Sequence, residues 1–324
     1  MNMPEPELAS APRPRVITGV FTLLRLVPVL SWSVSATLLG LAAAIGTLGW
    51  RPSFAWDALL VLVGTVSFQG LVAHGVNDLE DWRSGTDALS AGMLSGGSRV
   101  IPRGLLSRRQ VALCAWVAAI VGLAAAAALF VLHGPAVIVV AAIAVWSAVS
   151  YTHPLLRLSY RPFVGEILAG WPAVVTIIAG AAVVLTGQAG PGVWAAAAVQ
   201  ATMSVAWVMQ HHLPDVPADL RANPPKVTTP ALAARLWGPA AARLVPAGYY
   251  LFGALGAGVL GVVLHPVFYG SVVIGLLGAR EALLTDASSV PDVTRREFNM
   301  IALTGANAAL LIMAFLYGGL AVAG

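Results

Sequence analysis

The sequence predicts an all-α, polytopic membrane protein. Of its 324 residues, 58% are hydrophobic and only 10% are charged, and the mean hydropathy is +0.83. Long apolar stretches recur along most of the chain, and a helix needs about 20 such residues to cross ~30 Å of hydrocarbon. This composition excludes an ordinary soluble domain.

Nine apolar stretches are expected to form transmembrane helices. They cover residues 26–49, 57–76, 111–132, 135–152, 163–186, 191–212, 240–264, 266–284 and 298–322. We expect residues 1–20 to form a flexible cytoplasmic tail, because their start carries Pro, Glu and Arg but no short apolar core with a cleavage site. Residues 21–324 then form a single transmembrane domain, with long polar cap loops at 78–110 and 213–238.

Basic residues predict the orientation, because Lys and Arg are retained on the cytoplasmic side during insertion. With nine spans and a cytoplasmic N-terminus, every lysine and arginine except Arg51 falls on or near the cytoplasmic face. The net charge of +4 then reflects topology and anion binding, and it does not call for a nucleic-acid partner. We expect an integral protein of a bacterial-type plasma membrane, with no obligatory protein partner.

Two aspartate-rich segments stand out among only 14 acidic residues. The first runs from Asn77 to Asp87 and contains Asp78 and Asp81; the second contains Asp215 and Asp219 and is followed by Lys226. Spacings of three and four residues place each pair on one face of a helix. Magnesium prefers oxygen ligands and is usually held by one or two carboxylates together with substrate phosphates. The two segments therefore predict a magnesium-bridged diphosphate site.

Such a site also needs cations, because several carboxylates and a diphosphate repel one another. The available cations are Arg99, Arg157, Arg161, Arg221 and Lys226. Lys226 is the only lysine in the chain, and a compact ammonium suits a phosphate oxygen. The single cysteine, Cys114, lies in an apolar stretch and indicates neither a disulfide framework nor a thiolate cluster.

The first segment resembles the Asn-Asp-x-x-Asp-x-x-x-Gly-x-Asp signature of the UbiA superfamily of intramembrane prenyltransferases, and its Gly85 and Asp87 resemble the dihydroxynaphthoate branch. Stretches at 97–107 and 151–166 and the second aspartate pair agree in order and at fitting distances. The resemblance implies nine helices around a central cavity that opens to lipid on one side, with a diphosphate capped by the two long loops.

The resemblance also implies individual roles. Asp78 and Asp81, with Asn77 beside them, would hold one Mg²⁺, and Asp215 with Asp219 would hold the other. Asp87 would belong to the substrate-binding residues, either by supporting the groups that hold the metal or by positioning its loop. The contacts to diphosphate would come from Arg99, Tyr151, Arg157 and Lys226. The chain departs from the family around the second pair, where Gln210-His211-His212 replaces an Asn-rich run and residues 223–228 replace Gly-Lys-Arg-Thr.

The implied function is Mg²⁺-dependent transfer of a prenyl group from an allylic prenyl diphosphate to an aromatic, quinone-precursor-like acceptor, with release of pyrophosphate. The alternative is a membrane terpene cyclase of the same superfamily, which acts on prenyl diphosphate alone. A transporter is a third hypothesis, which the clustered aspartates on one face disfavour.

The sequence leaves two interpretations open for several polar residues. Glu166 is either paired structurally with an arginine such as Arg161 or catalytic, and a membrane carboxylate needs some partner. Adjacent His211 and His212 are more typical of polar helix ends than of a zinc site. Four further side chains either line an acceptor pocket or hydrogen-bond between helices: Gln69, His74, Asn299 and Asn307.

Overall fold

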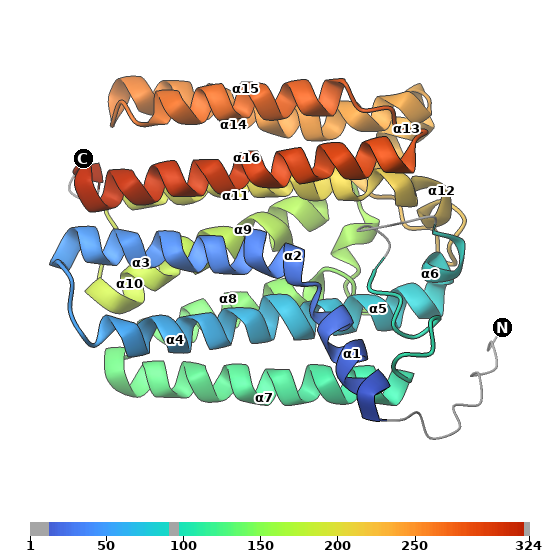
Figure 1. Cartoon of the computed structure of the whole chain (residues 1–324), viewed down its shortest axis with the longest axis horizontal. Coiled ribbons are helices and arrows are strands. Elements are labelled where there is room, and N and C mark those ends of the chain that lie inside the picture. The colour runs from blue at the N-terminus through green and yellow to red at the C-terminus, as the bar shows by residue number, and fades with distance from the viewer. Residues whose placement is uncertain (1–12, 91–96, 321–324) are drawn as a thin grey trace.

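The computed structural model describes residues 13–90 and 97–320, and in these two ranges the chain forms helices and loops without any strand. Figure 1 shows the long helices running side by side as one bundle. An all-α membrane fold was predicted, and the structure confirms it.

The helices of the N-terminal half, in chain order, are α1 (Arg13–Leu24), α2 (Leu26–Pro28), α3 (Ser35–Leu48), α4 (Phe54–Thr65), α5 (Ala73–Ser84), α6 (Thr86–Leu89), α7 (Arg108–His133) and α8 (Ala136–Ser150). Those of the C-terminal half are α9 (Trp171–Val175), α10 (Ala181–Thr186), α11 (Pro191–His211), α12 (Val216–Asp219), α13 (Thr229–Trp237), α14 (Leu244–Val263), α15 (Phe268–Leu283) and α16 (Val290–Tyr317).

Wider π-helical turns join several of these helices into continuous rods. They cover Val29–Val34 between α2 and α3, Val66–Val72 between α4 and α5, and Glu166–Gly170 and Thr176–Gly180 on either side of α9. Single π turns inside longer helices are often found at functional sites, because they turn side chains out of the regular helical register. Here each of these turns contributes residues to the internal cavities described below.

Seven rods in the described part of the chain are long and apolar enough to cross a membrane. They are Leu26–Leu48, Phe54–Ser84, Arg108–His133, Glu166–Thr186, Pro191–Asp219, Pro239–Val263 and Val290–Tyr317. The expected count of nine is not confirmed. The stretches at 135–152 and 266–284 correspond to α8 and α15, which have 15 and 16 residues. At 1.5 Å per residue these helices reach only about 22–24 Å, less than the ~30 Å of a hydrocarbon core.

The N-terminal segment differs from its prediction as a loose tail. Residues 1–12 lie outside the described ranges, but residues 13–20 are part of α1. Leu23 on this helix is fully buried against Val100 and Leu106 of the segment between α6 and α7. Apolar residues in α1 thus pack against the rest of the protein, which is why this part of the segment is helical.

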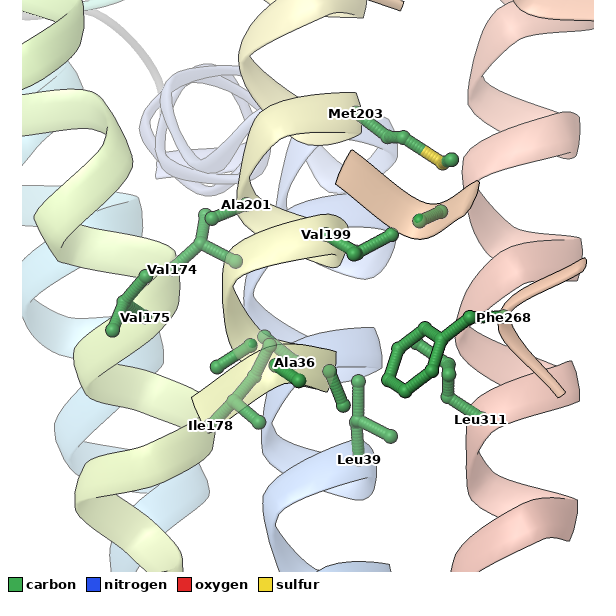
Figure 2. Close-up of a cluster of buried hydrophobic side chains, with 14 of the residues drawn as sticks. Ala36, Leu39, Val174, Val175, Ile178, Val199, Ala201, Met203, Phe268 and Leu311 are labelled. Carbon is green, nitrogen blue, oxygen red and sulfur yellow. The ribbon is translucent and has the colours of Figure 1, made fainter. Parts of the chain in front are cut away.

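The main hydrophobic core lies where α3, α11, α15, α16 and the rod that contains α9 and α10 meet. Leu39, Ile178, Phe268 and Leu311 are buried there, and Figure 2 shows them converging between the helices. Many of the remaining members are alanines, such as Ala196, which let neighbouring helices approach closely. This packing fixes the rods that carry the polar end of the bundle.

Both aspartate segments lie at one end of the bundle. Figure 1 shows the C-terminal part of α5 with α6, and α12 with α13, at the same end, near α1. The segments are far apart in the sequence, so it is the alternating direction of the rods that brings them together.

Candidate active site

The first aspartate segment is the end of a helix. Asp78 and Asp81 lie in the last turns of α5, which ends at Ser84 and is followed by Gly85 in the left-handed conformation, φ +84°. Glycine is suited to this position because it has no Cβ to clash with the backbone. The chain then turns into the short helix α6, which carries Asp87. Asp78 and Asp81 therefore project from a helix, as their spacing predicted, and this helix extends into the range 78–110 that was expected to form a cap loop.

The second segment is a set of short turns. α11 ends at His211, a 3-10 turn covers Leu213–Asp215, and α12 ends at Asp219. Two backbone hydrogen bonds fix the loop after α12: Lys226 N–H donates to the Asp219 carbonyl at 2.8 Å, and Asn223 N–H donates to the Ser84 carbonyl at 3.0 Å. The second bond ties this loop directly to the end of α5.

Lys226 joins the two aspartate segments. Its Nζ lies 3.2 Å from Asp81 Oδ1 and 3.8 Å from Asp219 Oδ1, and all three side chains are buried. Burial by itself lowers the pKa of Lys226, but the carboxylates of Asp81 and Asp219 outweigh it and hold the pKa well above its ordinary value. Asn77 Nδ2 donates to the other oxygen of Asp81 at 2.8 Å. The ammonium is therefore charged and compensates both segments.

Asp78 and Asp215 are held by groups that the sequence did not point to. Arg25 forms an ion pair with Asp78, and the hydroxyl of Ser98 donates to the same carboxylate. The hydroxyl of Ser90 donates to Asp215. Arg25 comes from the junction of α1 and α2, more than 50 positions before Asp78, and no local sequence pattern indicates the pair.

Gly97 allows the chain to pass close to the carboxylates. Its φ is +76°, and a Cβ there would lie 3.0 Å from Asp87 Oδ1, 3.1 Å from Arg25 Nη2 and 3.2 Å from Asp78 Oδ1. A side chain would therefore crowd two carboxyl groups and a guanidinium as well as strain the backbone. The close approach of these groups thus explains why a glycine stands at position 97, in the stretch 97–107.

Asp87 is buried without a hydrogen-bond partner for either carboxylate oxygen in the described part of the chain. Burial, followed by the charges of Asp81 and Asp78, raises the pKa of Asp87 to about 8. At neutral pH this carboxyl carries a proton, which limits the negative charge next to Asp78.

The donor set fits magnesium held jointly with a phosphate group. Among the described residues, no three His, Cys, Asp or Glu side chains lie together as a complete metal site. Both oxygens of Asp219 are buried without a hydrogen-bond donor. A carboxylate in that state favours a cation, and Mg²⁺ commonly takes one or two protein carboxylates and completes its shell with phosphate and water.

The remaining predicted diphosphate contacts surround this cluster. Arg157 Nε lies 2.9 Å from Oε1 of buried Glu80, so the next α5 carboxylate anchors this guanidinium. Arg99 donates to the backbone carbonyl of Ser90. Both arginines have positive φ, +54° for Arg99 and +46° for Arg157. Such backbone geometry is rare outside glycine and clusters at functional sites.

Tyr151 lies against the second segment. Its hydroxyl is 3.0 Å from His212 Nε2, and burial raises the pKa of this tyrosine above its ordinary value. Gly165 permits the close packing, because a Cβ on it would lie 3.0 Å from Tyr151 Cε2. His212 was expected to be an ordinary helix-end residue, and here it orients Tyr151.

The other ambiguous residues take different roles. Glu166 accepts a hydrogen bond from Thr229, and no ion pair joins it to Arg161 in the described ranges. His211 Nδ1 lies 2.7 Å from Glu297 Oε1.

Two of the four polar residues with open roles are hydrogen-bonded outside the cavities that adjoin the charged cluster. Asn307 donates to Gln200 Oε1 at 2.8 Å, and Asn299 donates to Glu281 Oε2 at 3.0 Å. Gln69 and His74 do line a cavity.

Three internal cavities extend in series from the charged cluster into the bundle. The first, of about 170 Å³, is lined by Asp81, Tyr151 and Lys226 and by the Trp32 and Trp207 rings, which meet edge to face at 6.1 Å. A second, of about 110 Å³, shares Trp32 and Tyr151 with it. A third, of about 70 Å³, is reached past Gln69 and is almost wholly apolar. The series can take a charged head and a hydrocarbon tail.

Comparison with known proteins finds solved structures that share this helical fold. Residues 33–305 match the UbiA prenyltransferase family. A UbiA homologue from Archaeoglobus fulgidus bound to GPP and Mg²⁺ is similar at 16% identity and a TM-score of 0.57, covering 89% of this chain and 99% of its own. The same protein bound to DMAPP and Mg²⁺ gives a TM-score of 0.58 over the same shares at 16% identity.

A UbiA homologue from Aeropyrum pernix K1 is similar at 18% identity and a TM-score of 0.53, covering 86% of this chain and 95% of its own. No match was found among the curated proteins. The family match covers most of the chain, and the helical membrane fold agrees with it. This integral membrane protein belongs to the UbiA prenyltransferase family.

Proposed function

We propose that the protein transfers a prenyl group from an allylic prenyl diphosphate to an aromatic, quinone-precursor-like acceptor, and that the reaction depends on Mg²⁺. The observation that carries this proposal is the buried junction of Asp81, Lys226 and Asp219, which lies at the mouth of an apolar cavity series. The A. fulgidus homologue of the same fold binds GPP or DMAPP together with Mg²⁺.

The aspartates would hold the metal. Asp78 and Asp81 with Asn77 would take one Mg²⁺, and Asp215 with Asp219 would take the other. When bound, Mg²⁺ supplies positive charge that stabilises pyrophosphate as the carbon–oxygen bond breaks.

The protein's own cations would also stabilise the departing pyrophosphate. Lys226, Arg157 and Arg99 lie around the cluster and would bind diphosphate oxygens, while Arg25 neutralises Asp78. Tyr151, held by His212, would donate to the diphosphate from the side of the cavity. Groups fixed in advance around a departing anion stabilise the transition state more than groups that must reorganise.

The cavity interior would protect the allylic cation. Trp32 and Trp207 present aromatic surface next to the charged cluster, and aromatic faces attract cations. The apolar third cavity would hold the tail and exclude water, which would otherwise capture the cation. The substrates of such a site are a lipid-soluble donor and an electron-rich ring.

We further propose that residues 21–324 act as one transmembrane domain, capped by 78–110 and 213–238. Since Lys and Arg are retained on the cytoplasmic side, the aspartate end and α1 would face the cytoplasm across a plasma membrane.

Product analysis by mass spectrometry tests the function. Purified protein in lipid is given Mg²⁺ and C10 to C40 prenyl diphosphates, each with and without hydroxylated aromatic acceptors. The expected result is a prenylated adduct that appears only with an acceptor. A cyclic terpene formed from prenyl diphosphate alone would instead show the cyclase.

The aspartate site is tested separately. Asp78→Ala combined with Asp215→Ala is expected to abolish Mg²⁺-dependent pyrophosphate release. The matched control is Asp286→Ala, which removes an exposed carboxylate that bonds to Ser288 and to no residue of the cluster, and it should leave the rate unchanged. Pyrophosphate release that survives the double substitution would contradict the assignment of the diphosphate site.

A further inference from the structure

Glu166 lies where two spaces in the protein meet. It is the first residue of the rod Glu166–Thr186 and is only 6% exposed. It lines the second internal cavity, which adjoins the charged cluster, and it also lines a wider groove of about 600 Å³ on the side of the bundle. Among the described residues, only Val205 also lines both spaces. The groove therefore meets the interior cavity at this carboxyl group.

The groove is an apolar surface that faces away from the bundle. It runs between the Glu166–Thr186 rod, α11, α13 and α14, and exposed Ile167, Trp237 and Phe252 line it. Glu166 is the only charged residue among the described groove-lining side chains. In a membrane this surface meets lipid, so a molecule dissolved in the bilayer can reach Glu166 without crossing the charged end.

Among the described residues, a single side chain holds the carboxyl group of Glu166. The hydroxyl of Thr229 donates to Oε1 and itself accepts a hydrogen bond from Phe163 N–H at 2.8 Å. The backbone N–H of Glu166 also lies against its own carboxyl group, and no second side chain among the described residues donates to it. Placing a carboxylate in a membrane segment is costly, and one neutral side-chain hydrogen bond offsets only part of that cost. A polar substrate group at Oε2 would account for the rest.

We propose that the groove admits an uncharged, membrane-dissolved hydroxyaromatic acceptor, and that Glu166 takes the proton this acceptor loses. This inference rests on the proposed transferase function. In the reaction the C1–O bond of the donor breaks and its electron pair leaves with pyrophosphate. A ring carbon of the acceptor forms the new bond to C1. The proton on that carbon passes to Glu166 Oε2, and the C–H electron pair restores the aromatic ring.

The charge pattern of the groove defines the acceptor class. A carboxylated ring would bring a negative charge next to Glu166 and would find no lysine or arginine among the described groove-lining residues. A hydroxyl group, in contrast, can donate to a carboxylate oxygen while the ring packs against Trp171 and Tyr249. Uncharged phenols and hydroquinones therefore fit, and aromatic acids do not.

The catalytic part of the inference is tested with Glu166→Gln. The amide keeps the shape and still accepts from Thr229, but it cannot take a proton. We expect adduct formation to fall at least 100-fold, in line with the ~10²–10⁴-fold contribution of a general base. Donor binding with Mg²⁺ should stay within twofold of wild type, and the ratio of prenyl alcohol to adduct should rise at least tenfold, because water captures the cation.

Two results would overturn the catalytic role. Adduct formation at the wild-type rate in Glu166→Gln is one. A parallel loss of donor binding and adduct, which a merely structural role would produce, is the other. Glu166→Asp, which keeps a carboxylate, should retain more adduct formation than Glu166→Gln and guards against misfolding of a single variant. If wild-type protein releases pyrophosphate but forms no adduct with any acceptor, the proposed function fails first.

Substitutions at two glycines of α14 test whether the acceptor enters through the groove. A Cβ on Gly248 or Gly256 would have no atom within 4 Å, so either can take a leucine without a clash, but only Gly248 lines the groove. Gly248→Leu should raise the KM for the acceptor at least tenfold and leave the donor KM unchanged; the matched control Gly256→Leu should change neither. An unchanged acceptor KM in Gly248→Leu would show that the groove holds only lipid chains.

Acceptor preference completes the test. With wild-type protein in lipid, kcat/KM should be at least tenfold higher for an uncharged phenol or hydroquinone than for the same ring with a carboxylate. The opposite order would overturn the inferred acceptor class.

Discussion

Replacing Lys226 with methionine should make the stability of the protein depend on Mg²⁺. The substitution keeps most of the side-chain volume but removes the charge 3.2 Å from Asp81 and 3.8 Å from Asp219. With an effective dielectric constant of about 20, these two attractions amount to roughly 5 and 4 kcal/mol before desolvation. Desolvation of the ammonium offsets much of this, and breaking a buried pair typically costs about 3–5 kcal/mol.

The assay is thermal unfolding in detergent, with and without Mg²⁺. A loss of about 3–5 kcal/mol corresponds to a fall in Tm of roughly 5–10 °C for a chain of this size. Millimolar Mg²⁺ should recover most of this loss in Lys226→Met, since a cation that binds the native carboxylates stabilises the folded state. In wild type the increase should be smaller, because Mg²⁺ must compete with the ammonium for the same oxygens.

The control for Lys226→Met is Arg221→Met. Arg221 lies in the same segment and is exposed, with its Nε donating to the Pro217 carbonyl at 3.0 Å. Removing its charge should shift Tm by little in either condition. The reasoning fails if Lys226→Met and wild type unfold at the same temperature without metal, or if Mg²⁺ leaves the loss in Lys226→Met unchanged.

Three further predictions concern the same cluster. Gly97→Ala should lower kcat/KM for the donor at least tenfold, because its Cβ would lie 3.2 Å from Asp78 Oδ1; steady-state pyrophosphate release measures this, and an unchanged value would contradict it. The pKa of Asp87, raised to about 8 mainly by burial, should fall when Mg²⁺ binds nearby, so binding at a pH below about 8 should release up to one proton and should tighten as the pH rises toward 8. Calorimetry in buffers of different ionisation enthalpy detects this proton, and Asp87→Asn should abolish its release. Tyr151→Phe should weaken donor binding about 5–30-fold by removing a hydroxyl that His212 orients, whereas equal affinity would exclude a contact with diphosphate.

The apolar pattern predicts the helices well because the thickness of the membrane's hydrocarbon core sets how long a spanning helix must be. The stretch predicted at 135–152 is found as Ala136–Ser150, and the one at 266–284 as Phe268–Leu283. Composition does not show where the hydrogen-bonded helix stops. α8 stops two residues before the predicted end, ahead of His153 and Pro154, and the residue before a proline disfavours helical geometry. This difference of a few residues is what leaves the predicted count of nine unconfirmed.

The site was predictable in its acidic residues but not in their partners. Spacing on α5 identifies Asp78 and Asp81, because a helix repeats every 3.6 residues. The pairing of Arg25 with Asp78 joins positions 53 apart, and that of Arg157 with Glu80 joins positions 77 apart. Such pairs depend on how rods cross in three dimensions, which no local period encodes. Only the requirement that buried charges be compensated could have indicated that partners exist.

The second cap segment couples the two halves of the proposed reaction. Lys226, at the charged cluster, and Thr229, which orients Glu166, are only three positions apart. Between them, the Thr228 side chain caps the start of α13 by accepting a hydrogen bond from Ala231 N–H. Because of this cap, Lys226 and Thr229 have little freedom to move independently of each other. A diphosphate that draws Lys226 away from Asp81 and Asp219 would therefore shift Thr229 and Glu166 as well. The carboxylate that receives the proton would thus be placed by the same event that fixes the leaving group, and the acceptor site would be complete only with the donor in place.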